Sequence, residues 1–413
     1  MSGFSTRMMA YGSTSILCLV LSMVLSSWLF FIASMVGFTI ILLSLSFLPK
    51  RLEIKRSLER ERTFEGEKVG VRIDLKSGGH GGNIEIYDPL SPALRISEGS
   101  NHALVPPGNR RLDYSVEAPL RGNQWVGPLK VRRWDPLWLW HRESEIGERE
   151  QLTVFPTIHP GSRGELTLKR PKPRPGAMHL RKLGSGKEFH SIRDYTPTDP
   201  FNTINWKAFA RTGKLLVNQY EAESVTDVVF LLDARMVTRA GKVIDNPLER
   251  SIRLCASLSR QLVRGSNRVG LLIYGSTVSV FKPEGGVTGF NNLLHQLAQV
   301  EPSGYSTFSS AVSYSMAYIP PEAPVMVLSP MSLDPTFKEG IRSLIARGHP
   351  VQVISPSGLE FEKQVSGNVV SPRYLLKHMS RENLIREIRD MGARVIDWNP
   401  EMNVESVIRE VWI

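Results

Sequence analysis

The feature that most constrains this chain is a run of 42 residues, Met8 to Pro49, without one charged side chain. The run is rich in Leu, Ile, Val, Phe and Met. A helix needs about 20 apolar residues to cross a bilayer, so the run is too long for one span and about right for two. We predict a transmembrane helical hairpin within residues 1–50 that turns at Ser26-Ser27-Trp28. A secretory signal peptide has an apolar region of only about 7 to 15 residues, which disfavours that alternative.

The charges on either side of this run predict its orientation. Arg7 precedes the run, and Lys50, Arg51, Lys55 and Arg56 follow it. Basic flanks of membrane helices face the cytoplasm, so we expect a multi-pass protein of the cell membrane with cytoplasmic soluble domains. A single long, tilted span that exports the soluble part is the alternative.

Residues 51–160 have the pattern of short β-strands. Val69, Val71, Ile73 and Leu75 alternate with other residues at the period of a half-buried strand. Similar alternations recur between Pro and Gly breaks, which predicts a β-sandwich-like module. This part shows no metal-ligand spacing and no nucleophile paired with a base, so we expect a spacer or binding module.

Residues 161–187 form a basic, proline-rich stretch. Seven cationic residues and no acidic residue lie between Lys169 and Lys187, and they alternate with Pro171, Pro173 and Pro175. Proline disfavours a regular helix, so an extended linker is predicted. We expect its charge to favour anionic membrane lipid, because clustered cations beside a membrane anchor attract such headgroups. Nucleic acid is not expected as a partner, since no aromatic side chains interleave for base stacking.

Residues 225–413 alternate between strands and helices. Val228 to Leu232 is a continuous apolar run, as expected for a strand that is buried on both faces of a parallel sheet. Asn246-Pro247 has the residues that begin a helix. Alternation of this kind continues to Trp398 and predicts a doubly wound α/β domain.

A signature segment, residues 188–224, precedes this domain. Its densest part reads Arg-Asp-Tyr-Thr-Pro-Thr-Asp-Pro-Phe-Asn-Thr-Ile-Asn-Trp-Lys-Ala-Phe-Ala-Arg from Arg193 to Arg211. With these motifs the chain resembles the family labelled "domain of unknown function 58", membrane-anchored proteins with a β-rich region and a degenerate von Willebrand factor A-like domain. Relatives are commonly found alongside MoxR-type AAA ATPases, so the resemblance implies an ATPase partner and a role in assembly or maturation of other proteins. Trp138 is a departure, because relatives often have glycine there.

The resemblance allows the metal site of a von Willebrand factor A domain to be compared position by position. A working site needs D-x-S-x-S at a strand end, a threonine from a second loop and an aspartate from a third. Asp233 matches, but Arg235 and a valine take the serine positions, and the third-loop position falls near Pro330. Ser306 or Thr307 could supply the second-loop hydroxyl. Because Mg²⁺ requires six oxygen ligands, we expect no metal and no cofactor, with Asp233 a vestigial position that pairs with Arg235 or another cation.

The signature segment supports two hypotheses. Its candidate interaction or structural residues are Arg193, Tyr195, Asp199, Asn205, Trp206, Lys207 and Arg211. In the structural hypothesis, Asp199 pairs with an arginine above Trp206 and Tyr195, the segment is fixed against the first strand of the α/β domain, and Asp199→Ala unfolds or loosens that domain. In the functional hypothesis, arginine and tryptophan anchor a partner protein, as they often do at interfaces.

Catalysis is not expected. His190, Ser191 and Asp194 are neighbours in sequence, but a catalytic triad is defined by spatial geometry. The chain has no P-loop, no HExxH, no CxxC pair and no dinucleotide fingerprint. We predict a membrane-anchored, non-catalytic protein-interaction or scaffold protein. The alternatives are a hydrolase or nuclease that uses the signature residues, or an extracellular adhesion module.

Overall fold

The computed structural model describes residues 2–44, 51–78, 82–160, 183–197, 199–221, 225–331, 334–365, 367 and 372–411. The chain divides into two compact units. The first consists of Met1–Thr157 with Leu294–Val300, and the second of Ile158–Leu293 with Glu301–Ile413. Most of the linker predicted at 161–187 lies outside the described residues, and its last part, from Leu183, already belongs to a strand.

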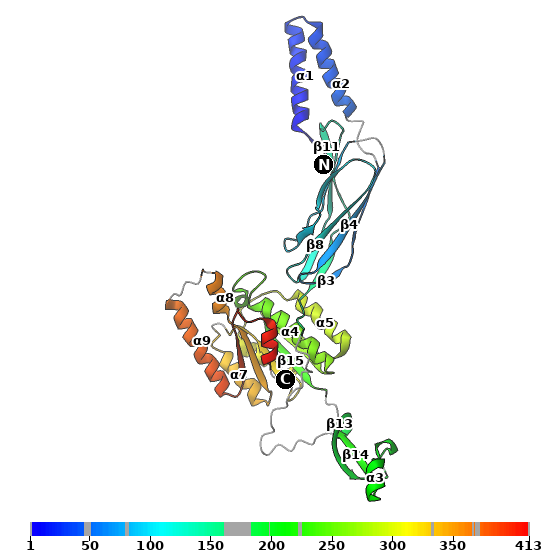
Figure 1. The fold of residues 1–413 in the computed structure, drawn as a ribbon. Helices are drawn as coiled ribbons and strands as arrows, with labels where there is room; N and C mark the ends of the chain where they lie inside the picture. Colours follow the sequence, from blue (N-terminus) through cyan, green and yellow to red (C-terminus); the bar gives the residue numbers. More distant parts are fainter. Residues whose placement is uncertain are drawn as a thin grey trace. The chain divides into compact units, whose positions relative to one another are not determined.

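Two apolar helices follow the short strand β1 (Ser2–Phe4) near the start of the first unit. Helix α1 (Thr6–Val24) and helix α2 (Trp28–Ser44) lie side by side and are joined by a short turn (Figure 1). Small residues allow α1 and α2 to approach each other closely, since a Cβ atom added at Gly37 of α2 would collide with the Ser15 side chain of α1. By length and composition α1 is able to cross a membrane, whereas α2 is a shorter apolar helix.

The described strands of the β-rich region form three sheets. The first has the order β1 (Ser2–Phe4), β11 (Trp140–Ile146), β10 (Leu129–Trp134), β5 (Ile84–Tyr87), β7 (His102–Val105). The second has the order β2 (Arg51–Leu58), β4 (Lys68–Gly78), β8 (Asn109–Glu117), β6 (Arg95–Glu98). The third has the order β3 (Arg62–Phe64), β12 (Glu150–Phe155), β9 (Gly122–Val126). The alternating residues predicted to face the core on β4 are buried, and they share one hydrophobic cluster with β5, β8 and β10.

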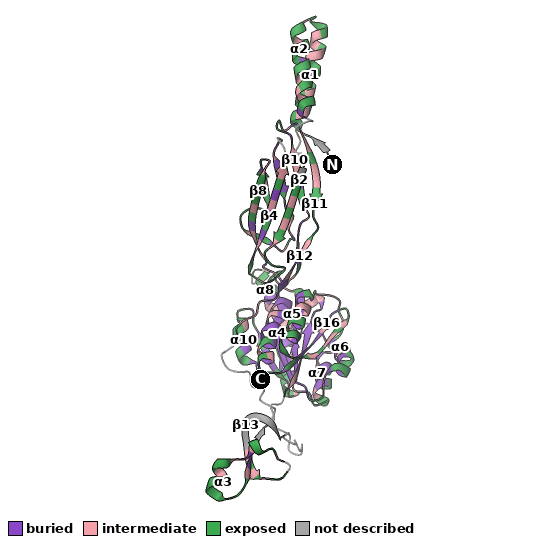
Figure 2. Ribbon diagram, turned by 90° about the vertical axis from the view of Figure 1, so that its right-hand side faces the viewer, coloured by how far each residue is buried: buried purple, intermediate pink, exposed green. Residues whose placement is uncertain are grey.

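The α/β region contains a six-stranded sheet. Its order is β17 (Val278–Glu284), β16 (Arg268–Tyr274), β15 (Asp227–Asp233), β18 (Val325–Leu328), β19 (Val351–Pro356), β20 (Arg394–Trp398). All neighbouring pairs are parallel except β16 with β17. The apolar runs of β15 and β18 are buried, as expected for strands covered on both faces, and Figure 2 shows this sheet as the buried part of the region.

Helices cover both faces of this sheet. The described helices of this part of the chain are α4 (Pro247–Arg264), α5 (Gly286–Gln299), α6 (Phe308–Ser315), α7 (Phe337–Ala346), α8 (Gly358–Val365), α9 (Pro372–Asp390) and α10 (Val404–Glu410), and the last residues of α5, from Leu294, belong to the first unit. Residues of α6, α7 and α9 join β15, β18 and β19 in one hydrophobic cluster. Helix α4 packs against the sheet outside that cluster and is itself covered by α10. The predicted start of α4 is confirmed, because the Asn246 side chain accepts a hydrogen bond from the backbone N–H of Glu249.

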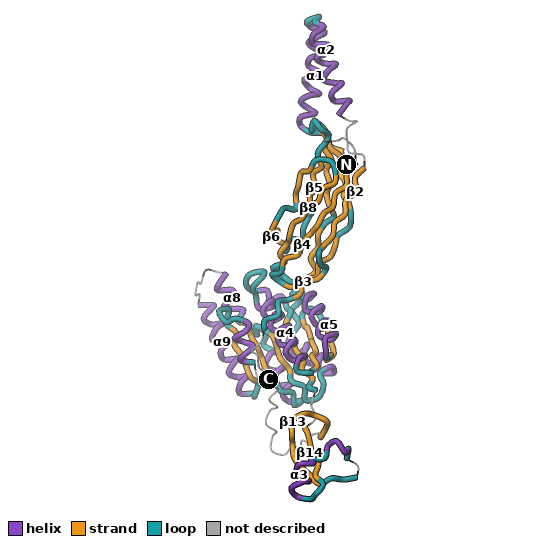
Figure 3. The backbone as a smooth tube through the Cα atoms, turned by 45° about the vertical axis from the view of Figure 1, so that its right-hand side comes forward, coloured by secondary structure: helices purple, strands orange, loops and turns teal. Residues whose placement is uncertain are grey.

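The signature segment folds as a small hairpin with a helical crossing. Strand β13 (Leu183–Asp194) pairs antiparallel with β14 (Leu216–Glu221), and between them lie a 3₁₀ turn (Phe201–Thr203) and helix α3 (Trp206–Thr212) (Figure 3). Ile204 and Val217 are the buried apolar residues of its described part. Most of the other side chains of the segment whose burial the structure describes are exposed or half-buried.

Candidate functional site

The carboxyl ends of the parallel strands meet at one edge of the α/β sheet. Asp233 ends β15, Tyr274 ends β16, and Ser329 follows β18. From β15 the chain first adds β16 on one side and later β18 on the other, so the strand order reverses beside Asp233. Open α/β sheets bind their ligands at such a switch point, so this edge is a candidate site.

The Arg235 side chain fills this position. Its Nη2 and Nε donate to the two carboxylate oxygens of Asp233 at 2.7 and 3.0 Å, and its Nη1 donates to Asp334 Oδ2 at 2.6 Å. The hydroxyl of Ser329 donates to the same Asp233 carboxylate at 2.7 Å. All of these side chains are buried, and the Tyr274 ring lies 5.2 Å from the guanidinium carbon. The ion pair predicted between Asp233 and Arg235 is therefore present, but Arg235 bridges two carboxylates.

Asp334 is the residue that sequence reasoning missed. The third-loop position was expected to fall near Pro330 and to lack its aspartate, and the Pro330 carbonyl accepts a hydrogen bond from Arg381 at 2.6 Å. Asp334 lies farther along the same loop, where it also accepts from the backbone N–H of Phe308 at 2.8 Å and from the Thr336 hydroxyl at 2.6 Å. An aspartate followed by proline and threonine is typical of a helix start, but this local signal does not place Asp334 beside Arg235, which lies 99 positions away.

The second-loop hydroxyls do not reach the carboxylates. The Thr307 side chain caps α6 by accepting a hydrogen bond from the backbone N–H of Ser310. The backbone carbonyl of Ser306 accepts a hydrogen bond from Arg235 Nη1 at 3.3 Å. The hydroxyl that contacts Asp233 belongs instead to Ser329, directly after β18.

The charges at this edge stabilise one another. Burial opposes the positive charge of Arg235, but the hydrogen bonds and negative charges of Asp233 and Asp334 outweigh it and raise the pKa of Arg235. Burial likewise opposes the charge of Asp334, yet hydrogen bonds from Thr336 and Phe308 and the charge of Arg235 lower its pKa. Burial is the largest cause that raises the pKa of Tyr274, and the negative charge of Asp233 raises it further, so this phenol stays neutral.

This arrangement does not fit a divalent metal. The guanidinium occupies the lone pairs of both carboxylates that a metal would use, and Mg²⁺ needs six oxygens in near-octahedral geometry. Within the described residues, no group of three or more His, Cys, Asp and Glu side chains is placed to hold a metal ion. Arg235 therefore supplies the positive charge at this edge of the sheet.

The signature residues form a second cluster. Arg193 makes a two-point ion pair with Asp199, and the backbone N–H and hydroxyl of Thr196 donate to the same carboxylate at 2.9 and 2.7 Å. The hydrogen bonds from Arg193 and then Thr196 hold the pKa of Asp199 well below its ordinary value. The Arg193 side chain is 39% exposed, so this pair lies at the surface. Water screens such pairs, and we expect Asp199→Ala to loosen the turn at Thr196 rather than unfold the domain.

The other signature residues have separate positions. Asn205 caps α3 by accepting from Ala208 N–H at 2.9 Å, and its amide donates to Asn218 at 2.9 Å. The expectation that Trp206 packs beneath the ion pair is wrong, because Trp206 begins α3 and is 61% exposed. Tyr195 is half-buried, with its ring 6.1 Å from that of Phe201. Lys207 and Arg211 are exposed on α3, four residues apart and therefore on one face.

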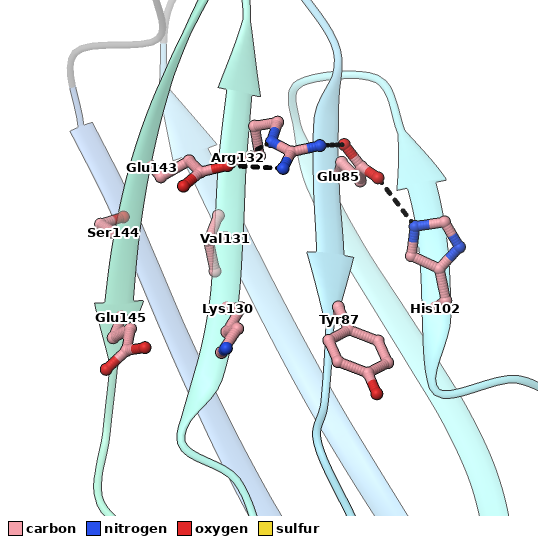
Figure 4. Close-up of a pocket in the computed structure, with 9 residues that line it drawn as sticks. All are labelled: Glu85, Tyr87, His102, Lys130, Val131, Arg132, Glu143, Ser144 and Glu145. Carbon is pink, nitrogen blue, oxygen red and sulfur yellow. Dashed lines mark hydrogen bonds and ion pairs between the residues drawn. The ribbon is translucent and has the colours of Figure 1, made fainter. Parts of the chain in front are cut away.

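A pocket of about 620 Å³ lies on the β-rich region (Figure 4). Glu85 accepts from Arg132 at 3.2 Å and from the Trp134 indole at 3.0 Å, and it pairs with His102 at 2.9 Å. Glu143 pairs with Arg132 from the neighbouring strand. These charges satisfy one another across four strands, which is the arrangement of a stabilising cross-strand network.

Together these features define a multidomain protein with an N-terminal apolar helix, a β-rich region and a C-terminal α/β region built on a parallel sheet. Residues 191–363 match the model of the family described as "Protein of unknown function DUF58". The match runs from the signature segment through the first part of the α/β region, so this part of the chain is similar to that family. It is also similar to "Uncharacterized protein YeaD" of Bacillus subtilis, with 21% identity over 288 residues that cover 66% of this chain and 68% of that protein.

Some solved structures resemble parts of this chain. The manganese-loaded TRAP protein of Plasmodium vivax is 16% identical, covers 36% of this chain and 65% of its own, and gives a TM-score of 0.25. Proximal thread matrix protein 1 from the mussel byssus is 11% identical, covers 46% of this chain and 45% of its own, and gives a TM-score of 0.28. At scores this low, neither likeness carries an argument about fold or function.

Proposed function

We propose that this chain is a membrane-anchored, non-catalytic interaction protein that docks a partner protein through its signature segment. In this proposal α1 and α2 form a two-span hairpin, and both soluble regions lie in the cytoplasm. The β-rich region is a sandwich-like module, and the α/β region is a degenerate von Willebrand factor A-like domain. Arg235 in the position of a metal supports the last point, since such a domain would bind its partner by another route.

The observation that carries the proposal is the exposed apolar surface of the signature segment. Phe201 is 74% exposed and Trp206 is 61% exposed, and Ile192, Phe209 and Leu215 are exposed as well. The Trp206 and Phe209 rings meet edge to face with centroids 6.2 Å apart. Aromatic side chains that stay exposed on so small a hairpin are typical of a docking surface, and tryptophan is enriched among the residues that dominate binding energy.

The charge beside this surface indicates the chemistry of the partner. Lys207, Arg211 and Lys214 are exposed, and no acidic residue occurs between Pro200 and Tyr220. Like charges four residues apart destabilise a helix slightly, and an acidic partner surface would relieve that repulsion. We therefore propose a protein partner with an acidic rim around an apolar pocket. The family resemblance makes a MoxR-type AAA ATPase the candidate.

Site-specific crosslinking in native membranes tests this proposal. A photoreactive phenylalanine analogue replaces Trp206 in the full chain, and the control carries the same group at Tyr314, an exposed aromatic residue of α6. We expect one dominant adduct from position 206 and none from position 314, with the ATPase identified by mass spectrometry. Equal adducts from both positions, or none above background, would show that the signature segment is not a docking surface. A specific adduct with another protein would retain the docking surface and reject the ATPase.

A further inference from the structure

A loop rich in tryptophan is bonded to the ends of both apolar helices. We name residues Trp134–Trp140, between β10 and β11, the Trp loop. The backbone N–H of Ser5, the cap of α1, donates to Leu139 O at 2.9 Å. The hydroxyl of Ser44, the last residue of α2, donates to Asp135 Oδ2 at 2.7 Å. These bonds place the Trp loop at the level where both helices leave the β-rich region.

Asp135 fixes the conformation of the Trp loop. Its buried carboxylate accepts from the backbone N–H groups of Leu137, Leu139 and Trp140 at 3.0, 2.6 and 2.9 Å, besides the Ser44 hydroxyl. The Trp loop is therefore held in one shape by its own carboxylate and by the end of α2.

Trp138 adopts a backbone conformation that glycine would adopt more easily. Its φ is +59°, in the left-handed region that is strained for a residue with a bulky side chain. The Trp138 ring lies 4.9 Å from that of Trp134, and Leu137 beside it is 49% exposed. Strained residues persist where the surrounding structure fixes them, and they cluster where a side chain has a function.

Cationic residues accompany these aromatic residues. Arg133 and Arg142 lie opposite each other on β10 and β11, and Arg7 is in the first turn of α1. Tryptophan together with arginine at the end of an apolar helix is the composition of a membrane–water interface, where the indole ring suits the headgroup level and cations face anionic lipid.

We propose that the Trp loop is an interfacial anchor, in which Trp138 and Leu137 lie in the headgroup layer of a phospholipid bilayer and the neighbouring arginines face anionic headgroups. The inference rests on the membrane anchoring proposed above. It adds that the β-rich region itself contacts lipid beside the helices.

Tryptophan quenching by brominated phospholipids tests this proposal. The full chain is reconstituted in vesicles of phosphatidylcholine and phosphatidylglycerol, with bromine either near the headgroup or deep in the acyl chains. We compare the intact chain with Trp138→Phe, with Trp28→Phe at the start of α2, and with Trp206→Phe in the signature segment. Trp138→Gly is a second variant, because glycine accepts the positive φ and so avoids the strain of this position.

We expect both Trp138 variants to lose lipid-quenchable emission, more with shallow than with deep bromine, and Trp206→Phe to leave it unchanged. If lipid-quenchable emission is lost in Trp28→Phe but in neither Trp138 variant, the interfacial anchor is rejected and the proposed membrane insertion of the helices is retained. If no variant loses lipid-quenchable emission, both the interfacial anchor and the membrane insertion on which it rests are rejected.

Discussion

At Arg235 one side chain holds two buried carboxylates that would otherwise repel each other. Removing one member of a buried ionic cluster typically costs about 3–5 kcal/mol, because the remaining charges lose their compensation. We expect Arg235→Ala to lower the free energy of unfolding by about that amount in urea titrations of the full chain. Arg268→Ala is the matched control, since Arg268 pairs with Asp227 at an exposed site and its loss should change little. Equal effects of the two variants would contradict the bridging role of Arg235.

The same residue predicts how the site responds to metal. Because the guanidinium occupies the oxygens of Asp233 and Asp334, we expect no saturable heat when Mg²⁺ or Mn²⁺ is titrated into the full chain. Calorimetry makes this measurement directly. Saturable binding that disappears in Asp233→Ala would restore the metal site and reject this account of it.

Asp334 is expected to make the free energy of unfolding of the α/β region fall at low pH. Hydrogen bonds and the charge of Arg235 outweigh burial and hold the pKa of Asp334 below its ordinary value of 3.8. The folded state therefore prefers the carboxylate, so this stabilisation is complete above the ordinary pKa and is lost as the pH falls through the lower, folded value. We expect Asp334→Asn to flatten the fall in stability below about pH 4, measured by denaturant titration at each pH. An unchanged slope would show that other carboxylates cause this fall.

At the scale of elements, the start of α4 offers a test with an internal control. The Asn246 side chain accepts from Glu249 N–H at 3.0 Å and donates to two backbone carbonyls, whereas Asn403, the cap residue of α10, makes no side-chain cap bond. Loss of a helix cap costs about 1 kcal/mol. We expect Asn246→Ala to lower the melting temperature and Asn403→Ala to leave it nearly unchanged. Similar shifts in both variants would mean that the cap bond is not the cause.

Elements with a strong local pattern could be predicted from the sequence. The alternation at Val69 to Leu75, the apolar run of β15 and the cap at Asn246 each depend on neighbouring residues, and each is found in the structure. Strand β17 was missed, because an edge strand with one exposed face lacks a continuous apolar run. The hairpin of the signature segment was missed as well, since β13 and β14 pair across a turn-rich insertion.

The candidate site was predictable only in part. Asp233 and Arg235 are two residues apart, so their pairing could be inferred from a strand end and a nearby cation. Asp334 lies 99 positions from Arg235, and only the folded sheet brings the two together. The exposure of Trp206 was not predictable, because tryptophan in a motif is more often buried than exposed, and its position as the first residue of α3 decides the outcome.

At the scale of the whole molecule, the two proposed functions lie on exposed surfaces. The signature segment presents exposed aromatic and cationic side chains to a proposed protein partner, and the Trp loop presents tryptophan and arginine to proposed lipid. The buried cluster at Arg235 has a different role, because its charges are compensated within the fold. This division explains why the exposed residues, and not Asp233, are the ones to vary in binding experiments.

The most direct test of the central claim is the affinity of the full chain in lipid nanodiscs for a purified MoxR-type AAA ATPase. The intact chain is compared with Trp206→Ala, with the double variant Lys207→Glu and Arg211→Glu, and with the control Tyr314→Ala. We predict saturable binding that weakens about 30-fold in Trp206→Ala, as for an interface hot spot of about 2 kcal/mol, and that weakens with salt. The charge-reversed variant should also bind more weakly, while Tyr314→Ala binds normally. No binding by the intact chain, or equal binding by all four proteins, would contradict docking of this ATPase through the signature segment.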